Sequence, residues 1–392
     1  MRFLHTSDWH LGRSLHRFDL REAQAAFLDH LVETARSARV DAVLVSGDVY
    51  DRAIPPVDSV ALYEDALARL RATGARVILI SGNHDSARRL GVNSALVDAS
   101  GVHLRTRPGA LAEPVVLTDS GGEVAVYGVP YLEPALGLPD PGGQAAATGD
   151  AEPGAATRSH VSVLSAALAL IRADAAARAA TRTVVMAHGW VHGGQASDSE
   201  RDISVGGAGS VPASLFAGFG YVALGHLHGR QTLAENMRYS GSPLPYSFSE
   251  KDHEKGTWLV DVAADGRASA EWVRAPVFRR LTVLRGRIED LLAARAHDGH
   301  ERDFVAVTLT DTVRPEGAME RLRARFPHIL TLEFKPEGLT ADPRSYGQKV
   351  KGRDDLTVAA EFVRHVRHDD ATGPERELLA AAFTAVRAGG EH

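Results

Sequence analysis

Five short blocks of the sequence combine aspartate, asparagine and histidine in a way that could build a metal centre. They are SDWH ending at His10, GDVYD around Asp48, GNHD around His84, AHG at His188 and GHLH ending at His228. The oxygen and nitrogen donors that they supply are Asp8, His10, Asp48, Asn83, His188, His226 and His228. Carboxylate, amide and imidazole donors suit two divalent cations that share one bridging carboxylate. Such a pair of cations is typical of enzymes that cleave phosphate esters.

The spacing inside the blocks favours one shared site. Asp8 and His10 are two residues apart, as are His226 and His228, and on an extended backbone such pairs point to the same side. The glycine before Asp48 allows a sharp turn that would bring this carboxylate to the bridging position. Each block alone has a structural alternative, such as a helix cap, a tight turn or a hydrogen-bonded core histidine. The combination of blocks therefore predicts the metal centre.

One histidine of the blocks is not needed as a ligand. His84 follows the ligand Asn83 and could donate a proton to a leaving oxygen, and Asp85 could orient its ring. The donor set favours manganese, with iron and zinc as alternatives. The remaining histidines lack partners at useful spacing and are expected to be structural; they include His5, His16, His103 and His160.

The donor blocks follow the strands that the sequence predicts. Apolar strands ending in SD, GD and GNHD alternate with helices over 19–38 and 57–73, which favours an α/β sheet covered on both faces. Functional sites gather at the carboxyl ends of the strands in such sheets. Asp8, Asp48 and Asn83 should therefore meet at one edge. The same strand-then-donor pattern returns in TRTVVMAHG and FGYVALGHLH, after a predicted helix over 159–180.

The composition bounds the architecture. The chain has 392 residues, 44% of them apolar and none of them cysteine, which predicts two or three domains and fits a reducing cytoplasm. MRFLHTSDWH lacks the features of a signal peptide, and the apolar run 161–171 is too short to cross a bilayer. The net charge of −6 argues mildly against a protein that binds nucleic acid on its own. A partner is therefore expected to supply much of the binding to nucleic acid. We expect a cytoplasmic protein with no membrane segment.

Three domains are predicted: 1–275, 276–337 and 338–392. A Gly-, Pro- and Ala-rich stretch over 137–157 reads as a loop inside the first, because donor blocks continue beyond it. The second is a small alternating α/β unit. The third carries two amphipathic helices, which either pack on their own protein or dock on the helices of a partner.

The longer strings around the blocks resemble a known family. HTSDWHLGRSL, SGDVYD, SGNHDSARRL, SDSERDISVGG, ALGHLHGRQ and RYSGSPLPYSFSE occur in this order. The blocks are similar to those of the calcineurin-like metallophosphoesterases, and the longer strings resemble the SbcD family, the bacterial nuclease subunits of SbcC–SbcD complexes. The resemblance covers nearly the whole chain apart from 137–157. It implies an α/β (α+β) metallophosphoesterase fold, with a central β-sandwich flanked by helices, a small α/β capping domain and a C-terminal helical tail.

The resemblance also implies roles for the residues. One ion would be held by the positions Asp8, His10, Asp48 and His228, and the other by Asp48, Asn83, His188 and His226. His84 would be the proton donor. The expected activity is that of a manganese-dependent 3′-to-5′ DNA exonuclease and single-strand endonuclease that acts on hairpins and blocked ends. The expected partners are DNA and an SbcC-like coiled-coil ATPase docked on the tail, with a homodimer of this chain inside a heterotetramer.

Two other functions use the same fold. The first is a phosphomonoesterase or cyclic-nucleotide phosphodiesterase acting on small substrates, which would not require the sequence after Val277. The second is a non-catalytic interaction module, against which the complete donor set argues.

Overall fold

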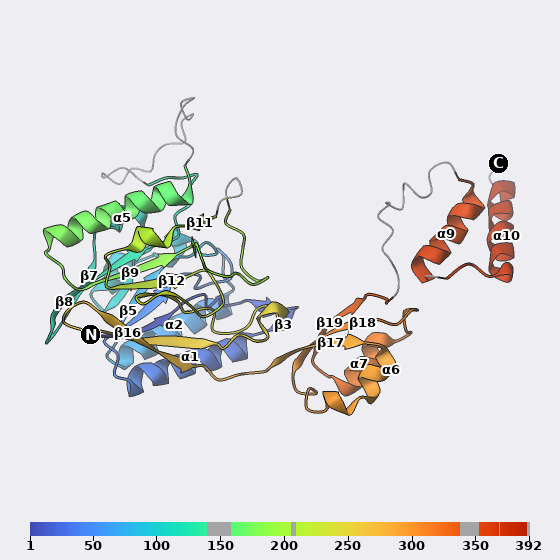
Figure 1. Cartoon of the computed structure of the whole chain (residues 1–392), viewed down its shortest axis with the longest axis horizontal. Helices are drawn as coiled ribbons and strands as arrows, with labels where there is room; N and C mark the ends of the chain where they lie inside the picture. Colours follow the sequence, from blue (N-terminus) through green and yellow to red (C-terminus); the bar gives the residue numbers. More distant parts are fainter. Residues whose placement is uncertain (139–157, 205–208, 338–352, 368, 390–392) are drawn as a thin grey trace, which may run out of the picture. The chain divides into compact units, whose positions relative to one another are not determined.

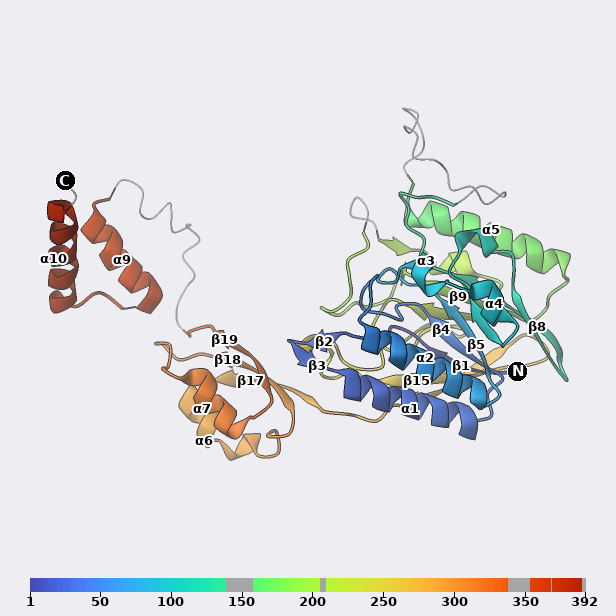
Figure 2. The ribbon, with the colours of Figure 1, turned by 180° about the vertical axis from the view of Figure 1, so that it is seen from behind.

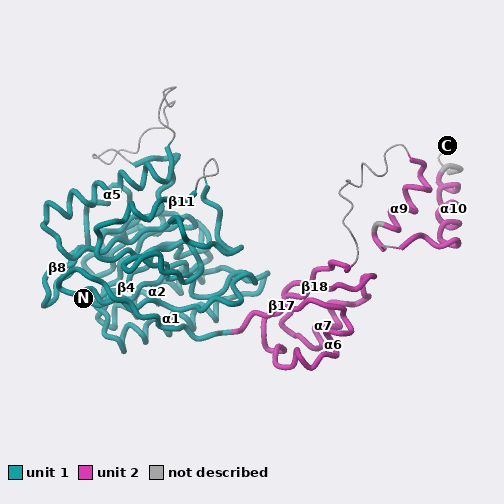
Figure 3. Tube along the Cα trace, viewed as in Figure 1, with its two compact units in different colours: residues 1–278 teal, residues 279–392 magenta. Residues whose placement is uncertain are grey.

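The computed structural model describes residues 1–138, 158–204, 209–337, 353–367 and 369–389 (Figure 1). They fall into two compact units, Met1–Phe278 and Arg279–His392 (Figure 3). The three-part division of the chain stays a prediction. Of the loop expected over 137–157, all but the first two residues lie outside the described residues.

The first unit is built on two six-stranded sheets. Sheet 1 has the order β16 (Ala268–Arg274), β15 (Gly256–Val262), β1 (Arg2–Thr6), β4 (Ala42–Ser46), β5 (Arg76–Ile80) and β6 (Val102–Leu104). Sheet 2 has the order β13 (Gln231–Ala234), β14 (Met237–Tyr239), β12 (Tyr221–Gly225), β9 (Thr183–His188), β8 (Gly122–Val129) and β7 (Val115–Asp119). In each sheet four adjacent strands pair in parallel. Antiparallel pairing adds β15 and then β16 at one edge of sheet 1, and β13 and β7 at the two edges of sheet 2.

The two sheets pack face to face and form a sandwich. Their shared core joins Phe3, Leu44 and Ile78 of sheet 1 to Val184 and Tyr221 of sheet 2, all fully buried. Strands with both faces covered are apolar along their whole length, which explains the continuous runs in β4 and β5. The expected α/β fold with a central β-sandwich is confirmed.

Helices cover the outer faces of the sandwich. On sheet 1 lie α1 (Arg21–Ser37) and α2 (Val57–Ala72), with the short α3 (Ala87–Leu90) and α4 (Ser94–Asp98) nearby (Figure 2). On sheet 2 lies α5 (His160–Ala177), which Ser159 begins with a capping box. By length and composition α5 is apolar enough to span a membrane, and its buried side chains pack on sheet 2. Short strand pairs join β2 (Ser14–Leu15) to β3 (Phe18–Asp19) and β10 (Trp190–Val191) to β11 (Ser210–Val211).

His5 links the two sheets from inside the core. Its ring nitrogens lie 3.0 Å from the Tyr221 hydroxyl and 3.1 Å from the Leu224 carbonyl oxygen. The ring is fully buried, and burial lowers the pKa of His5 to about 3. The structural role expected for this histidine agrees with these contacts.

Acid should destabilise the first unit through His5. Between pH 6.5 and pH 3 the unfolded chain takes up a proton on this residue and the folded chain does not, so stability falls as the pH falls through this window. Compared with the variant His5→Gln, the wild type should lose about 2 kcal/mol more of its free energy of unfolding between pH 7 and pH 5. Urea unfolding at both pH values measures the difference. His16→Gln, at an exposed site, is the control, and equal losses in wild type and His5→Gln would refute the prediction.

The second unit contains a three-stranded parallel sheet of β17 (Leu281–Gly286), β18 (Phe304–Leu309) and β19 (Ile329–Phe334). The crossovers carry α6 (Ile288–Ala293) and α7 (Ala318–Arg325). Leu291, Leu322 and Phe326 bury their side chains against the sheet. This arrangement is the alternating α/β unit that the sequence predicts.

The last described elements are α9 (Asp355–Arg367) and α10 (Gly373–Gly389). The two helices contact each other, and Arg367 forms an ion pair of 2.6 Å with Glu375 at the turn between them. Large apolar side chains stay exposed on both helices, including Val366, Leu378 and Val386. The pair therefore carries apolar surface that the described residues leave uncovered.

Candidate metal centre

The loops that follow β1 and β4 are joined by main-chain hydrogen bonds. The amide of Asp8 donates to the Gly47 carbonyl and that of His10 to the Asp48 carbonyl, both at 3.0 Å. Asp8, His10 and Asp48 all have positive φ, at 52°, 45° and 49°. The expectation that Asp8 and His10 share an extended segment was wrong, because both lie in a left-handed loop. They nevertheless reach one cluster.

Two glycines make room for Asp48. Gly47 has a φ of +87°, which a residue with a side chain rarely adopts. A Cβ on Gly82 would lie 2.1 Å from the Asp48 Oδ1 atom and 2.4 Å from its amide nitrogen. Asp48 therefore occupies its position only because both neighbouring turns lack side chains.

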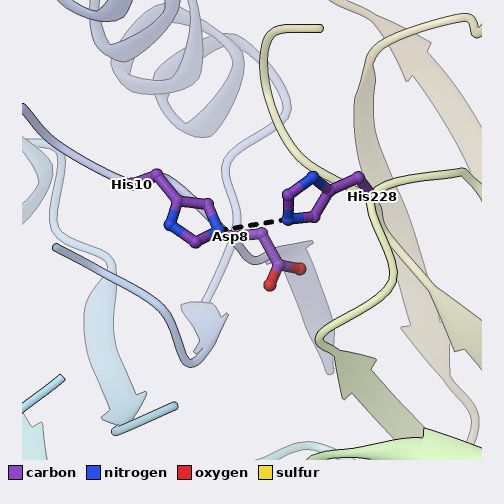
Figure 4. Close-up of side chains that lie close together, drawn as sticks. All are labelled: Asp8, His10 and His228. Atoms are coloured by element: carbon purple, nitrogen blue, oxygen red, sulfur yellow. Dashed lines mark hydrogen bonds between the residues drawn. The ribbon is translucent and has the colours of Figure 1, made fainter. Parts of the chain in front are cut away.

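One cluster of donors contains Asp8, His10 and His228 (Figure 4). Their ligand atoms lie within 4.8 Å of one another, and all three side chains are buried. The Nε2 atoms of His10 and His228 are 3.1 Å apart. Asp8 and His10 come from the end of β1, and His228 follows β12 of the other sheet.

A second cluster contains Asp48, His188 and His226. The Oδ1 atom of Asn83 lies 3.0 Å from His188 Nε2 and 3.1 Å from His226 Nδ1, so this amide joins the same cluster. Asp48 Oδ2 is 3.4 Å from His188 Nε2 and 3.6 Å from His10 Nε2. Asp48 thus lies between the two clusters, as a bridging carboxylate must.

The chemistry of the donors fits two divalent cations. The Nε2 atoms of His10 and His228 point at each other, so at most one of them can donate in the contact. The Oδ1 atom of Asn83 faces the ring nitrogens of His188 and His226 in the same way. A set of converging lone pairs beside two carboxylates is what a metal site provides.

The electrostatics of the site centre on Asp48 and His188. Burial alone would lower the pKa of His188, but the Asp48 charge and hydrogen bond raise it to about 9. Burial would raise the pKa of Asp48, yet His188 and His10 hold it well below its ordinary value. Burial raises the pKa of Asp8 to about 6 and lowers that of His226 to about 3. A cation bound by His188 near neutral pH would have to displace a proton from it.

His226 and His228 serve different clusters, although their spacing suggested a shared direction. His226 has a φ of 107°, and its amide donates to both carboxylate oxygens of Asp8 at 3.0 and 3.1 Å. The sharp bend at His226 turns its ring toward Asn83. The two imidazoles therefore diverge.

His84 lies at the edge of the site and is only partly buried. Its amide donates to Asp48 Oδ1 and its Nδ1 atom lies 2.9 Å from the Asp51 carbonyl oxygen. The suggestion that Asp85 orients the His84 ring was wrong. The Asp85 carboxylate instead accepts hydrogen bonds from the amides of Val49, Tyr50 and Gly82, at 2.9–3.1 Å.

The other histidines that were expected to be structural have contacts away from the clusters. His103 Nδ1 lies 2.9 Å from Asp98, and His160 Nε2 lies 2.7 Å from the Ile203 carbonyl oxygen. Sequence patterns assigned no role to Ser199 and Glu250, which lie buried behind His228. The sequence strings that contain them, SDSERD and SFSE, contributed only to the family resemblance.

Comparison with known proteins gives two family matches. The family described as calcineurin-like phosphoesterase matches residues 1–230, and the type 5 capsule protein repressor C-terminal domain matches residues 277–367. The chain is 27% identical over 391 residues to a protein of Staphylococcus saprophyticus that is named as a subunit of the nuclease SbcCD, with 98% of each chain covered.

Two solved structures are also similar. A protein of Thermus thermophilus has a TM-score of 0.39 and 15% identity, over 70% of this chain and 99% of its own. A dimetal phosphatase from Danio rerio has a TM-score of 0.40 and 15% identity, over 70% of this chain and 96% of its own.

The first family match takes in every loop of the two clusters. It spans more than half of the chain and runs from before Asp8 to beyond His228. The chain belongs to the calcineurin-like phosphoesterase family and resembles the SbcD nuclease subunit along nearly its whole length.

Proposed function

We propose that this chain is a metal-dependent DNA nuclease, the phosphodiester-hydrolysing subunit of a complex with a coiled-coil ATPase. The observation that carries the proposal is the meeting of both donor clusters at Asp48, with ligand atoms from two sheets. The relative along 98% of the chain is named as a nuclease subunit, which supports DNA as the substrate. The activities proposed are 3′-to-5′ exonuclease and single-strand endonuclease cleavage of hairpins and blocked ends.

Each cluster is proposed to hold one cation, with Asp48 shared. Asp8, His10 and His228 complete one ligand set, and Asn83, His188 and His226 complete the other. Manganese is the proposed metal because the donors are oxygen and imidazole nitrogen without sulfur. When bound, such a pair of ions activates a water molecule and neutralises charge on the phosphate oxygens.

His84 is proposed to protonate the leaving 3′-oxygen. Its Nδ1–H can donate to the Asp51 carbonyl, which fixes the ring, and a second proton on Nε2 would be the one given to the leaving oxygen. The His84 ring stands edge-on to His10, with ring centroids 4.7 Å apart, and His84, His10 and Asp48 form a third group whose ligand atoms lie within 4.8 Å of one another. His84 is left out of both proposed ligand sets because each set is complete without it. Part of its surface is exposed, as a group that meets DNA requires.

A digestion assay on hairpin DNA tests the proposal. Manganese should support cleavage by the full chain, and a chelator should abolish it. Addition of the ATPase partner and ATP should change the rate or the products. If the chain instead hydrolyses p-nitrophenyl phosphates rapidly and leaves oligonucleotides intact, it is a small-substrate phosphoesterase. No hydrolysis of either substrate would favour the interaction module.

The proposed assembly contains DNA, an SbcC-like ATPase and two copies of this chain, in the cytoplasm and without a membrane segment. The relative's name, which makes it a subunit of SbcCD, supports the ATPase. For a homodimer, the exposed side chains of Ile54, Val57 and Leu96 offer apolar surface on the first unit. Light scattering of the purified chain would give its mass.

The tail should bind the ATPase through its exposed apolar side chains. Leu378 and Val386 lie on α10 with 71% and 72% of their surface exposed. The double change Leu378→Asp with Val386→Asp should weaken binding to the partner at least tenfold, because it introduces charge into an apolar contact. Intrinsic manganese-dependent cleavage should stay at the wild-type rate. Calorimetry with the purified partner measures the affinity; Glu377→Ala is the matched control, and an unchanged affinity of the double variant would refute the role of the tail.

A further inference from the structure

Behind His228 lies a buried chain of polar side chains. The Nδ1 atom of His228 is 2.5 Å from the Ser199 hydroxyl oxygen, and that hydroxyl also bonds the Glu250 carboxylate. Lys255 forms an ion pair with the other oxygen of Glu250. The Glu250 side chain is fully buried and that of Lys255 is 9% exposed. Burying an ion pair is costly, so its position beside a metal-site histidine calls for a reason.

The direction of the hydrogen bonds between these side chains follows from the charge of Glu250. The Glu250 carboxylate is paired with the Lys255 ammonium, so it is ionised and can only accept. Ser199 must therefore donate its proton to Glu250. Its oxygen is then left to accept from Nδ1–H of His228.

This direction decides which nitrogen of His228 carries the proton. With the proton on Nδ1, the Nε2 atom has a free lone pair, and Nε2 is the atom that faces Asp8 and His10 (Figure 4). A metal-bound histidine commonly donates its other ring N–H to such an acceptor, which fixes both tautomer and ring orientation. Here a serine stands between the imidazole and the carboxylate.

The main chain of His228 is held by the same segments. Its amide donates to Glu200 at 2.7 Å, and its carbonyl accepts from Lys255 at 2.8 Å. Lys255 also donates to the Ser242 hydroxyl at 2.9 Å. Ring and backbone of His228 are thus fixed together, by Lys255 itself and by a residue next to Ser199 in the sequence.

We propose that Ser199, Glu250 and Lys255 are positioning residues that fix His228 as the Nδ1–H tautomer and thereby set the cation affinity of the cluster of Asp8, His10 and His228. The inference rests on the proposed function only in requiring that the clusters bind cations. It does not require that the chain cleaves DNA.

The test is a calorimetric titration of the metal-free full chain with Mn²⁺. In Ser199→Ala, one of the two binding steps should weaken about 10- to 100-fold, as loss of such a hydrogen-bond partner does. The other step should stay within about twofold of wild type, because the Asn83 amide joins His188 and His226 and not His228. The matched control is Ser249→Ala, which removes a hydroxyl that bonds Ser247 and the amide of Asp198.

Two further variants separate positioning from a merely structural role. Ser199→Thr keeps the hydroxyl and should bind Mn²⁺ with wild-type affinity. Glu250→Gln should weaken the same binding step as Ser199→Ala does, and it serves as the test if Ser199→Ala does not fold. Glu254→Gln, an exposed neighbour paired with Arg274, is the control for Glu250→Gln. If Ser199→Ala or Glu250→Gln lowers only the unfolding temperature of the metal-free chain and leaves both manganese affinities at wild type, the proposal is overturned.

The wild-type chain separates this inference from the proposed function. If it binds two Mn²⁺ ions and leaves DNA intact, the nuclease proposal fails while the affinities of the variants still decide the role of Ser199. If it binds no manganese, the positioning role falls as well.

Discussion

The variant His84→Ala is expected to cleave hairpin DNA about 10²- to 10⁴-fold more slowly than the wild type, because a positioned general acid usually accelerates a reaction by this factor. His84 bonds the Asp51 carbonyl and belongs to neither proposed ligand set, although it forms a third group of possible donors with His10 and Asp48. Its removal should leave manganese binding at two ions per chain. Single-turnover cleavage with saturating Mn²⁺ measures the rate, and elemental analysis measures the metal content.

The pattern of losses in His84→Ala distinguishes proton donation from metal binding. A substrate whose leaving group needs no proton, such as a p-nitrophenyl phosphodiester, should be affected far less than DNA. His192→Ala, an exposed histidine close in sequence to His188, is the matched control and should cleave normally. If His84→Ala cleaves DNA at the wild-type rate, His84 is not the proton donor.

The variant Asp48→Asn should lose both cations and nearly all activity. Asp48 is the carboxylate that lies between the clusters, 3.4 Å from His188 and 3.6 Å from His10. The amide can still accept the hydrogen bond from the His84 main chain, so the loop is retained while the negative charge is removed. Loss of several kcal/mol of charge stabilisation lowers the rate on the order of a thousandfold or more.

Metal analysis and circular dichroism check the Asp48 prediction. The spectrum of Asp48→Asn should match that of the wild type, and the manganese content should fall well below two ions per chain. Asp265→Asn, an exposed change in the turn between β15 and β16, should keep both ions. Two tightly bound ions in Asp48→Asn would show that another group bridges the metals.

The sequence predicted the strands, the order of elements and the meeting of the donors. Asp8, Asp48 and Asn83 follow apolar runs, and parallel strands place their carboxyl ends at one edge. It could not predict the backbone of the loops. The left-handed conformations of Asp8 and His10 depend on main-chain bonds to Gly47 and Asp48, which are remote in sequence.

The roles of the supporting residues depended on contacts that no local pattern contains. Asp85 was expected to orient His84, its neighbour, but its carboxylate reaches the amides of Val49 and Tyr50 across the sheet edge. Glu250 lies 51 residues from Ser199 along the chain, and only the folded sandwich brings them together. Long-range contacts of this kind require the tertiary structure.

The proposed ligands of the metal centre come from both sheets, and this has a consequence for the protein without its metals. Asp8, His10 and Asp48 extend from sheet 1, whereas His188, His226 and His228 extend from sheet 2. Each bound cation would cross-link the two layers, so ligand binding adds to the free energy of unfolding in proportion to the logarithm of metal concentration. Without bound cations the two layers would separate more readily at this edge.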